Sequence, residues 1–135
     1  MTYLLDTNSF VGHMRHGPAS KVTGRLLTVS PGSVHLCSVV LAELIFGAIR
    51  SGPTKEPANR SLIAILQSRF ASLPFDDAAA EEYGRIRAHL AGLGMPIGPN
   101  DLMIAAIALA NRMTLVTSNT GEFSRVPGLQ LENWQ

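Results

Sequence analysis

The sequence predicts a three-layer α/β/α, Rossmann-like fold with a mostly parallel sheet, and three observations support this prediction. Short apolar runs alternate along the chain with longer segments in which apolar residues recur at helical spacing. Hydrophobic residues make up 46% of the chain and charged residues 16%, which favours a well-filled core over disorder. The length of 135 residues suits a single domain, residues 1–135. Alternating strands and helices in one domain are typical of a parallel sheet covered on both faces.

The N-terminal half is expected to contain two buried strands, each followed by helices. Pro18 suits the first turn of a helix, because its fixed φ matches that position. The segment SVVLAELIFGAIR is apolar nearly all round, which predicts a largely buried helix. The expected elements are a strand at 2–5, helices at 8–15 and 18–27, a strand at 34–37 and a helix at 38–50.

The C-terminal half continues the alternation after a break at SGPTKEP, residues 51–57. Asp76 or Asp77 is expected to cap the long helix that follows the third strand. The segment LMIAAIALA predicts a second strongly apolar helix. The expected elements are helices at 59–70, 76–93 and 99–112, strands at 73–75, 114–117 and 129–131, and loops at 94–98 and 118–123.

Acidic and polar residues follow the predicted strands at the points where function usually collects. Asp6 directly follows the first strand, and Asp101 opens the helix that precedes the strand at 114–117. In open parallel sheets, binding sites lie outside the carboxyl ends of the strands. Helix capping is the alternative interpretation of both acids, although for the first helix we expect the cap at Thr7 or Asn8 instead.

Glu43 lies in the middle of an apolar helix, and this position makes it the most informative single residue for predicting the site. A carboxylate among apolar neighbours must reach solvent or have a partner, because burying it alone costs several kcal/mol. One interpretation is therefore structural: Glu43 marks a narrow solvent face or pairs with an arginine such as Arg50. The other is that Glu43 converges with Asp6 and Asp101 on one site.

Three converging carboxylates favour a divalent metal site. Clustered carboxylates repel one another unless a cation is bound, and no lysine lies beyond Lys55. Mg²⁺ prefers oxygen ligands, keeps several waters and can activate a water for attack on a phosphodiester. We therefore expect metal-assisted phosphodiester hydrolysis with Asp6, Glu43 and Asp101 as catalytic and metal-binding residues. The residues expected to orient these ligands or waters are Thr7, Asn8, Thr117 and Ser118.

The fourth position of the site has two candidates. Asn119 follows a strand as an acidic ligand would, but its amide carries no charge. Glu122, three residues further on, is the nearest carboxylate that could supply the missing charge. Loop capping is the structural alternative for both residues.

The basic residues offer candidates for nucleic-acid contacts, although the net charge of +1 indicates nothing by itself. Nine of the eleven basic residues are arginine, which suits phosphate recognition. Any one of these residues could equally belong to an ordinary solvated face. The candidates for RNA phosphate binding are Arg15, Lys21, Arg25, Arg85 and Arg87.

Four segments, in this order, resemble PIN-domain endoribonucleases, specifically the VapC toxins of type II toxin–antitoxin systems. They are MTYLLDTN, SVVLAELIFGA, GPNDLMIAAIALA and TLVTSNTGEFSRVPGLQLENW, and they span essentially the whole chain. The resemblance implies a PIN-domain fold and an RNase that depends on Mg²⁺ or Mn²⁺, with its acidic pocket at Asp6, Glu43 and Asp101. It also implies a homodimer, inhibited by a cognate VapB-type antitoxin, and RNA, including tRNA, as the substrate. Asn119 departs from the resemblance, because many PIN domains carry Asp there.

Other classes of protein fit the sequence less well. A receiver domain would need adjacent acids after the first strand and a late lysine, and a nucleotide-binding module would need a glycine-rich phosphate loop. A PIN-like scaffold that binds RNA or a partner without cleaving it stays open, because of Asn119. We expect no membrane span and a cytoplasmic location, with Cys37 as a buried structural thiol.

Overall fold

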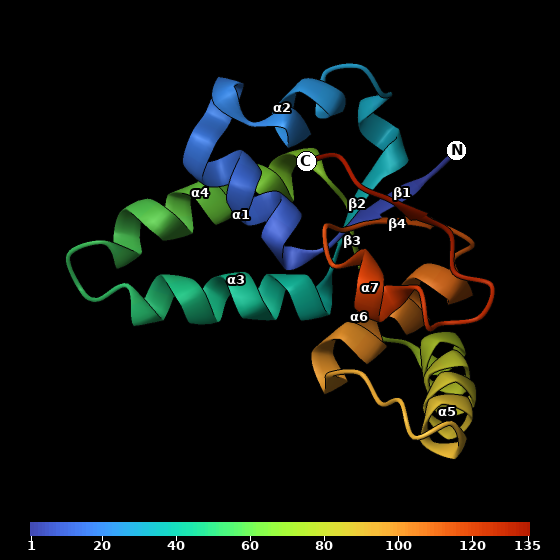
Figure 1. The fold of residues 1–135 in the computed structure, drawn as a ribbon. Helices are drawn as coiled ribbons and strands as arrows, with labels where there is room; N and C mark the ends of the chain where they lie inside the picture. Colours follow the sequence, from blue (N-terminus) through green and yellow to red (C-terminus); the bar gives the residue numbers. More distant parts are fainter.

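The computed structural model describes residues 1–135 and shows five parallel strands between layers of helices (Figure 1). The strands are β1 (Tyr3–Leu5), β2 (Val34–Cys37), β3 (Ser72–Leu73), β4 (Thr114–Val116) and β5 (Leu131–Glu132). Their order across the sheet is β3-β2-β1-β4-β5, and every neighbouring pair is parallel. The predicted α/β fold is confirmed, and the carboxyl ends of β1 and β4 meet at the middle of one sheet edge.

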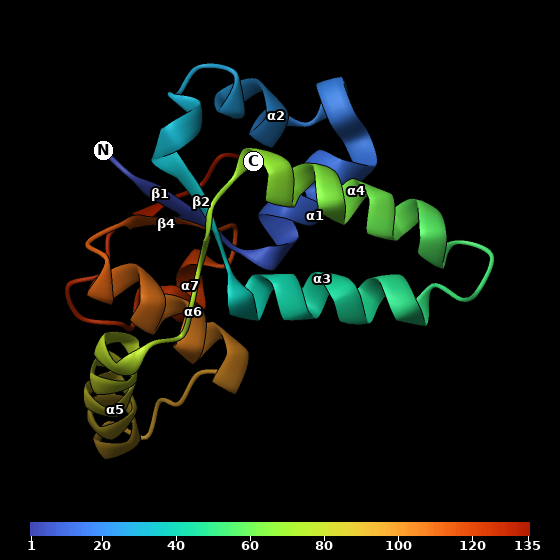
Figure 2. The same cartoon turned by 180° about the vertical axis from the view of Figure 1, so that it is seen from behind.

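Helices cover both faces of this sheet. They are α1 (Thr7–His16), α2 (Lys21–Leu26), α3 (Ser38–Arg50), α4 (Glu56–Arg69), α5 (Asp77–Gly92), α6 (Pro99–Ala110) and α7 (Thr120–Phe123). In both views α5 and α6 lie together on one side of the strands, and α1, α2 and α4 lie on the other (Figures 1 and 2). Helix α3 leaves the carboxyl end of β2 and projects beside α4, which leaves its outer surface open. No helix of the chain has the length and apolar character needed to span a membrane.

The position of the central strands in the core explains why their sequences are continuous apolar runs. Leu4, Leu5 and Leu115 are fully buried, because helices cover both faces of the strands that carry them. Helix α6 is buried over the consecutive residues Ile104–Ala108, since it lies between the sheet and α5. The Cys37 thiol is also fully buried, and this burial raises its pKa to about 11.

The largest difference from the prediction in the N-terminal half is the start of α2. Pro18 does not begin α2; it lies in a short 3-10 helix, Gly17–Ala19, that follows the end of α1. Helix α2 begins at Lys21, because the Ser20 hydroxyl accepts a hydrogen bond from the backbone N–H of Thr23 and so caps it. The positive φ of 48° at Gly17 turns the chain between the two helices.

The C-terminal half also differs at its short elements. Pro57 lies in the first turn of α4 and does not belong to the break before it. Helix α7 occupies part of the predicted loop at 118–123, and β3 and β5 lie up to two residues from their expected positions. Each of these edge strands has only two residues, so little apolar periodicity marks its ends. Asp76 caps α5 by accepting from the backbone N–H of Ala79, as one of the two expected options.

Candidate active site

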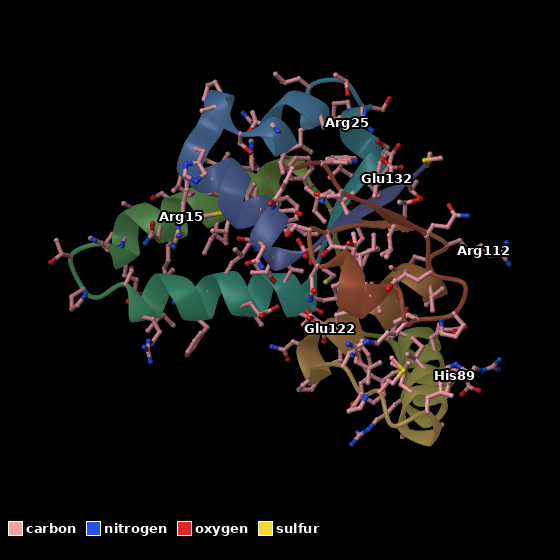
Figure 3. The ribbon with its side chains drawn as sticks, viewed as in Figure 1. Arg15, Arg25, His89, Arg112, Glu122 and Glu132 are labelled. Atoms are coloured by element: carbon pink, nitrogen blue, oxygen red, sulfur yellow. The ribbon has the colours of Figure 1, made fainter.

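The candidate site lies at the carboxyl edge of β1, β2 and β4. Asp6 follows β1, α3 begins directly after β2, and Thr117 follows β4. Figure 3 shows Glu122 on α7, close to the ends of α3 and α6. Segments far apart in the sequence therefore bring their polar side chains to one edge, as expected for an open parallel sheet.

Asp6 is held by hydrogen bonds to both of its carboxylate oxygens, and its side chain is only 5% exposed. Oδ1 accepts from the backbone N–H of Ser9 at 2.9 Å, and Oδ2 accepts from the Thr117 hydroxyl at 2.6 Å. Asp6 is thus the N-cap of α1, and the expected cap at Thr7 or Asn8 is wrong. The reason is the extended backbone at Asp6, with φ −75° and ψ 174°, which is the usual conformation of an N-cap. Capping leaves each oxygen a further lone pair for a ligand.

Glu43 has a hydroxyl partner inside the site. The Thr7 hydroxyl donates to Glu43 Oε1 at 2.8 Å, and the carboxylate is partly buried. The alternative that Glu43 pairs with Arg50 is wrong, because the Arg50 guanidinium lies 5.9 Å from the centre of the Phe46 ring instead. Glu43 therefore has no ion-pair partner.

Asp101 lies in the first turn of α6, where the other acids surround it. Burial and the nearby charges of Glu122, Glu43 and Asp6, in that order, raise the pKa of Asp101 to about 6, and Asn119 opposes this shift. The three ion pairs of the chain are Arg25–Glu132, Arg60–Glu56 and Arg85–Glu81, so none of them neutralises the site. The edge therefore concentrates negative charge that no ion pair of the protein balances.

Glu122 joins α7 to the segment before α6. Its Oε1 accepts from the backbone N–H of Gly98 at 2.8 Å, and its Oε2 accepts from the Asn119 side-chain amide at 2.9 Å. These two hydrogen bonds lower the pKa of Glu122. The Arg125 guanidinium donates to the carbonyl of Pro96 at 3.2 Å, so α7 and the second residue after it hold residues 96–98 at two points. The sequence gives no signal for the Gly98 contact, because a backbone N–H is common to almost every residue.

The donor set fits a hard divalent cation that keeps part of its water shell. No group of three Asp, Glu, His or Cys side chains converges closely enough to hold a metal ion by itself. Mg²⁺ does not need such a cage, because it is usually bound by one or two carboxylates together with waters. The oxygen ligands and the raised pKa of Asp101 both indicate a place where a cation would relieve repulsion.

The remaining candidate residues divide between the site and the surface around it. Thr7 and Thr117 hydrogen-bond to the site carboxylates, whereas Asn8 and Ser118 are exposed beside them. Ser9 was not expected here; it is buried, and its hydroxyl donates to the carbonyl of Val116 at 3.3 Å. Its place in the DTNS segment, three residues after the cap, is the signal that could have identified it.

The basic candidates are not equivalent. Arg25 pairs with Glu132 and lies 5.1 Å from the centre of the Trp134 ring. Arg85 pairs with Glu81 on the exposed face of α5, and Arg87 hydrogen-bonds to a phenol on the same helix. The side chains of Arg15 and Lys21 make no ion pair or hydrogen bond, and both line a hollow next to Asn8 and Ser118.

Comparisons with known proteins agree with this architecture. The PIN domain model matches residues 3–129. Ribonuclease VapC2 of Rickettsia felis and the tRNA(fMet)-specific endonuclease VapC of Shigella flexneri are each 40% identical over 134 residues, covering 99% of this chain and 98% of the relative. The structure of VapBC2 from Rickettsia felis, bound to a DNA fragment from its promoter, contains a chain with 38% identity and a TM-score of 0.91, with both chains covered completely.

Proposed function

Because this chain belongs to the VapC ribonucleases of the PIN-domain family, we propose that it is a Mg²⁺-dependent endoribonuclease and the toxin of a toxin–antitoxin pair. The observation that carries the metal dependence is Asp101, whose pKa is raised to about 6 by burial and by three neighbouring carboxylates. A divalent cation would offset this repulsion at neutral pH, and Mn²⁺ could replace Mg²⁺ because both favour oxygen ligands.

The residues of the site divide into those that would hold the ion and those that position them. Asp6, Glu43 and Asp101 would hold Mg²⁺ directly or through water. When bound, Mg²⁺ would neutralise charge on the phosphodiester and lower the pKa of a coordinated water. Thr117 orients Asp6 and Thr7 orients Glu43, each by a hydroxyl hydrogen bond to the carboxylate. Glu122 holds Asn119 and Gly98 and so positions the start of α6.

We propose tRNA as the substrate class. Two relatives, from Shigella flexneri and Salmonella typhimurium, are named tRNA(fMet)-specific endonucleases and are 40% and 34% identical to this chain. End-mapping of RNA fragments after expression of the chain tests this assignment; cuts spread over other RNAs, with tRNA intact, would contradict it.

A VapB-type antitoxin is the proposed partner, as supported by the VapBC complexes among the similar structures. A hollow of about 350 Å³ between α1, α3 and α4 is lined by Thr7 and Glu43 of the acidic site. Phe46 and Ile49, on α3, are 64% and 51% exposed. An antitoxin segment with apolar residues and an arginine could cover this surface and pair with the carboxylates, in competition with the metal.

A homodimer is also part of the proposal, since the family resemblance implies one. Leu93 and Met95, at the far end of α5, are 58% and 45% exposed and offer apolar surface apart from α3. Light scattering during size-exclusion chromatography measures the mass directly. A monomer at micromolar concentration would contradict the dimer and leave the nuclease assignment untouched.

The central experiment is cleavage of purified tRNA with and without Mg²⁺, by wild type and by Asp6→Asn and Asp101→Asn. We expect cleavage by wild type only, and only when the ion is present. The alternative is a PIN-like protein that binds RNA without cutting it. It is supported by the uncharged Asn119 and by the lack of a preformed three-ligand cluster. It would be supported if all three proteins bind RNA and none cleaves it.

A further inference from the structure

A second hollow, of about 490 Å³, adjoins the acidic site on the side of α1 and α2. Its lining is mainly polar and contains three basic side chains and no Asp or Glu. The lining includes Asn8, Arg15, His16, Lys21 and Ser118.

Two of these residues connect the hollow to the acidic site through the chain itself. Asn8 lies two residues after Asp6, and Ser118 follows Thr117, whose hydroxyl donates to Asp6 at 2.6 Å. Arg15 lines this hollow and also the neighbouring one that contains Thr7 and Glu43. The basic hollow therefore lies directly beside the acidic site, and Arg15 lines both hollows.

The cations of this hollow are available, unlike most others on the protein. Arg15 and Lys21 are exposed, and their side chains have no ion-pair, hydrogen-bond or aromatic partner. Of the other arginines, Arg25, Arg60 and Arg85 are engaged by carboxylates and Arg50 and Arg87 by aromatic rings. Arg69 and Arg112 are also unpaired, but they do not line this hollow. Free cations grouped in a hollow without acids attract an anion and lose no existing contact when they bind it.

We propose that this hollow binds a backbone phosphate of the RNA next to the one that is cleaved. Arg15 and Lys21 supply the positive charge, and Asn8 and Ser118 supply neutral hydrogen-bond donors. This inference rests on the proposed ribonuclease function and deepens it, because it indicates the path that the RNA strand takes across the protein surface. A polyanion is repelled by the acidic edge, so cations beside that edge would hold the strand in register while the scissile phosphate lies over the carboxylates.

The test is RNA binding in an Asp101→Asn background, which keeps the substrate uncut. Fluorescence anisotropy with a labelled single-stranded RNA, across a range of salt concentrations, compares the Arg15→Ala/Lys21→Ala variant with Arg85→Ala/Arg87→Ala. Both double variants remove two positive charges, but α5 lies on the opposite side of the sheet from α1 and α2 (Figures 1 and 2). Because Arg15 and Lys21 hold one phosphate together, their loss should lower the salt slope by about 0.7 and weaken binding roughly fourfold at physiological salt.

The outcomes separate this proposal from the proposed function. A lower slope for the Arg15/Lys21 variant alone, with an unchanged melting temperature, supports the phosphate site. Equal losses in both double variants would show diffuse charge attraction and overturn it, and so would no loss in either. Cleavage by otherwise wild-type protein is measured separately, so the site can fail while the nuclease assignment stands.

Discussion

The Thr7 hydroxyl donates a 2.8 Å hydrogen bond to Glu43 across 36 residues of sequence. Thr7 also directly follows Asp6, which accepts a 2.6 Å hydrogen bond from Thr117. The start of α1 is therefore tied to α3 by one hydroxyl and to the end of β4 by another. A shift in this turn would move two carboxylates of the site together, which makes both threonines useful for testing the site.

Removing the Thr7 hydroxyl should lower activity more than stability. Thr7→Val keeps the shape of the side chain but leaves Glu43 without its donor. We expect a roughly 10- to 100-fold loss of cleavage, typical when the partner of a metal-binding residue is removed. The measurements are tRNA cleavage at saturating Mg²⁺ and the melting temperature. Wild-type rates in this variant would show that Glu43 does not need the hydrogen bond.

Glu43→Gln tests whether Glu43 acts through its charge. The glutamine side-chain oxygen can still accept from Thr7, so the fold should be preserved while cleavage is lost. Circular dichroism and thermal unfolding provide the control. A large fall in melting temperature would instead support a structural role for Glu43.

Metal binding should weaken as the pH falls through about 6, because protonation of Asp101 removes a ligand charge. Calorimetric titration of Mg²⁺ at pH 7.5 and at pH 5 measures this effect. In Asp101→Asn the remaining affinity should be low and nearly independent of pH over this interval. An equal fall in wild type and variant would assign the dependence to another group.

Asp101 should also make the metal-free protein less stable as the pH rises. Its pKa is raised from an ordinary 3.8 to about 6 in the fold, so the folded state binds more protons between these values. Stability therefore falls from about pH 4 to about pH 6 and then levels off. We expect Asp101→Asn to raise the melting temperature at pH 7.5 but not at pH 3.5. Asp77→Asn, in the first turn of α5, is the matched control and should show no such gain.

Glu122→Ala should loosen the segment before α6 more than it weakens metal binding. Its two oxygens hold Gly98 and Asn119, and their loss removes one of the two contacts that fix residues 96–98. Hydrogen exchange of this segment should increase, while Mg²⁺ affinity should fall less than in Asp101→Asn. Asn119→Ala, measured alongside, separates the two candidates for the fourth position. Unchanged exchange with a loss of affinity equal to that of Asp101→Asn would identify Glu122 as a direct ligand.

The order of the main elements and the candidate residues of the site were predictable from the sequence. Apolar runs and helical spacing are local properties, and they place Asp6 after β1 and Asp101 at the start of α6. Glu43 was identifiable because a carboxylate among apolar neighbours requires a partner or solvent. The two-residue edge strands were placed less accurately, since so few residues carry little periodicity.

The partners of these residues follow from how the chain folds in three dimensions. Asp6 is a cap and also an acceptor from Thr117, a contact across 111 residues, and Glu122 holds Gly98 across 24. The distinction between the free Arg15 and the paired Arg25 has the same origin. In the segment MTYLLDTNS, Asp6 caps α1 through one carboxylate oxygen and belongs to the acidic site through the other. Such contacts depend on which distant segments the sheet brings together, and local sequence patterns do not predict this.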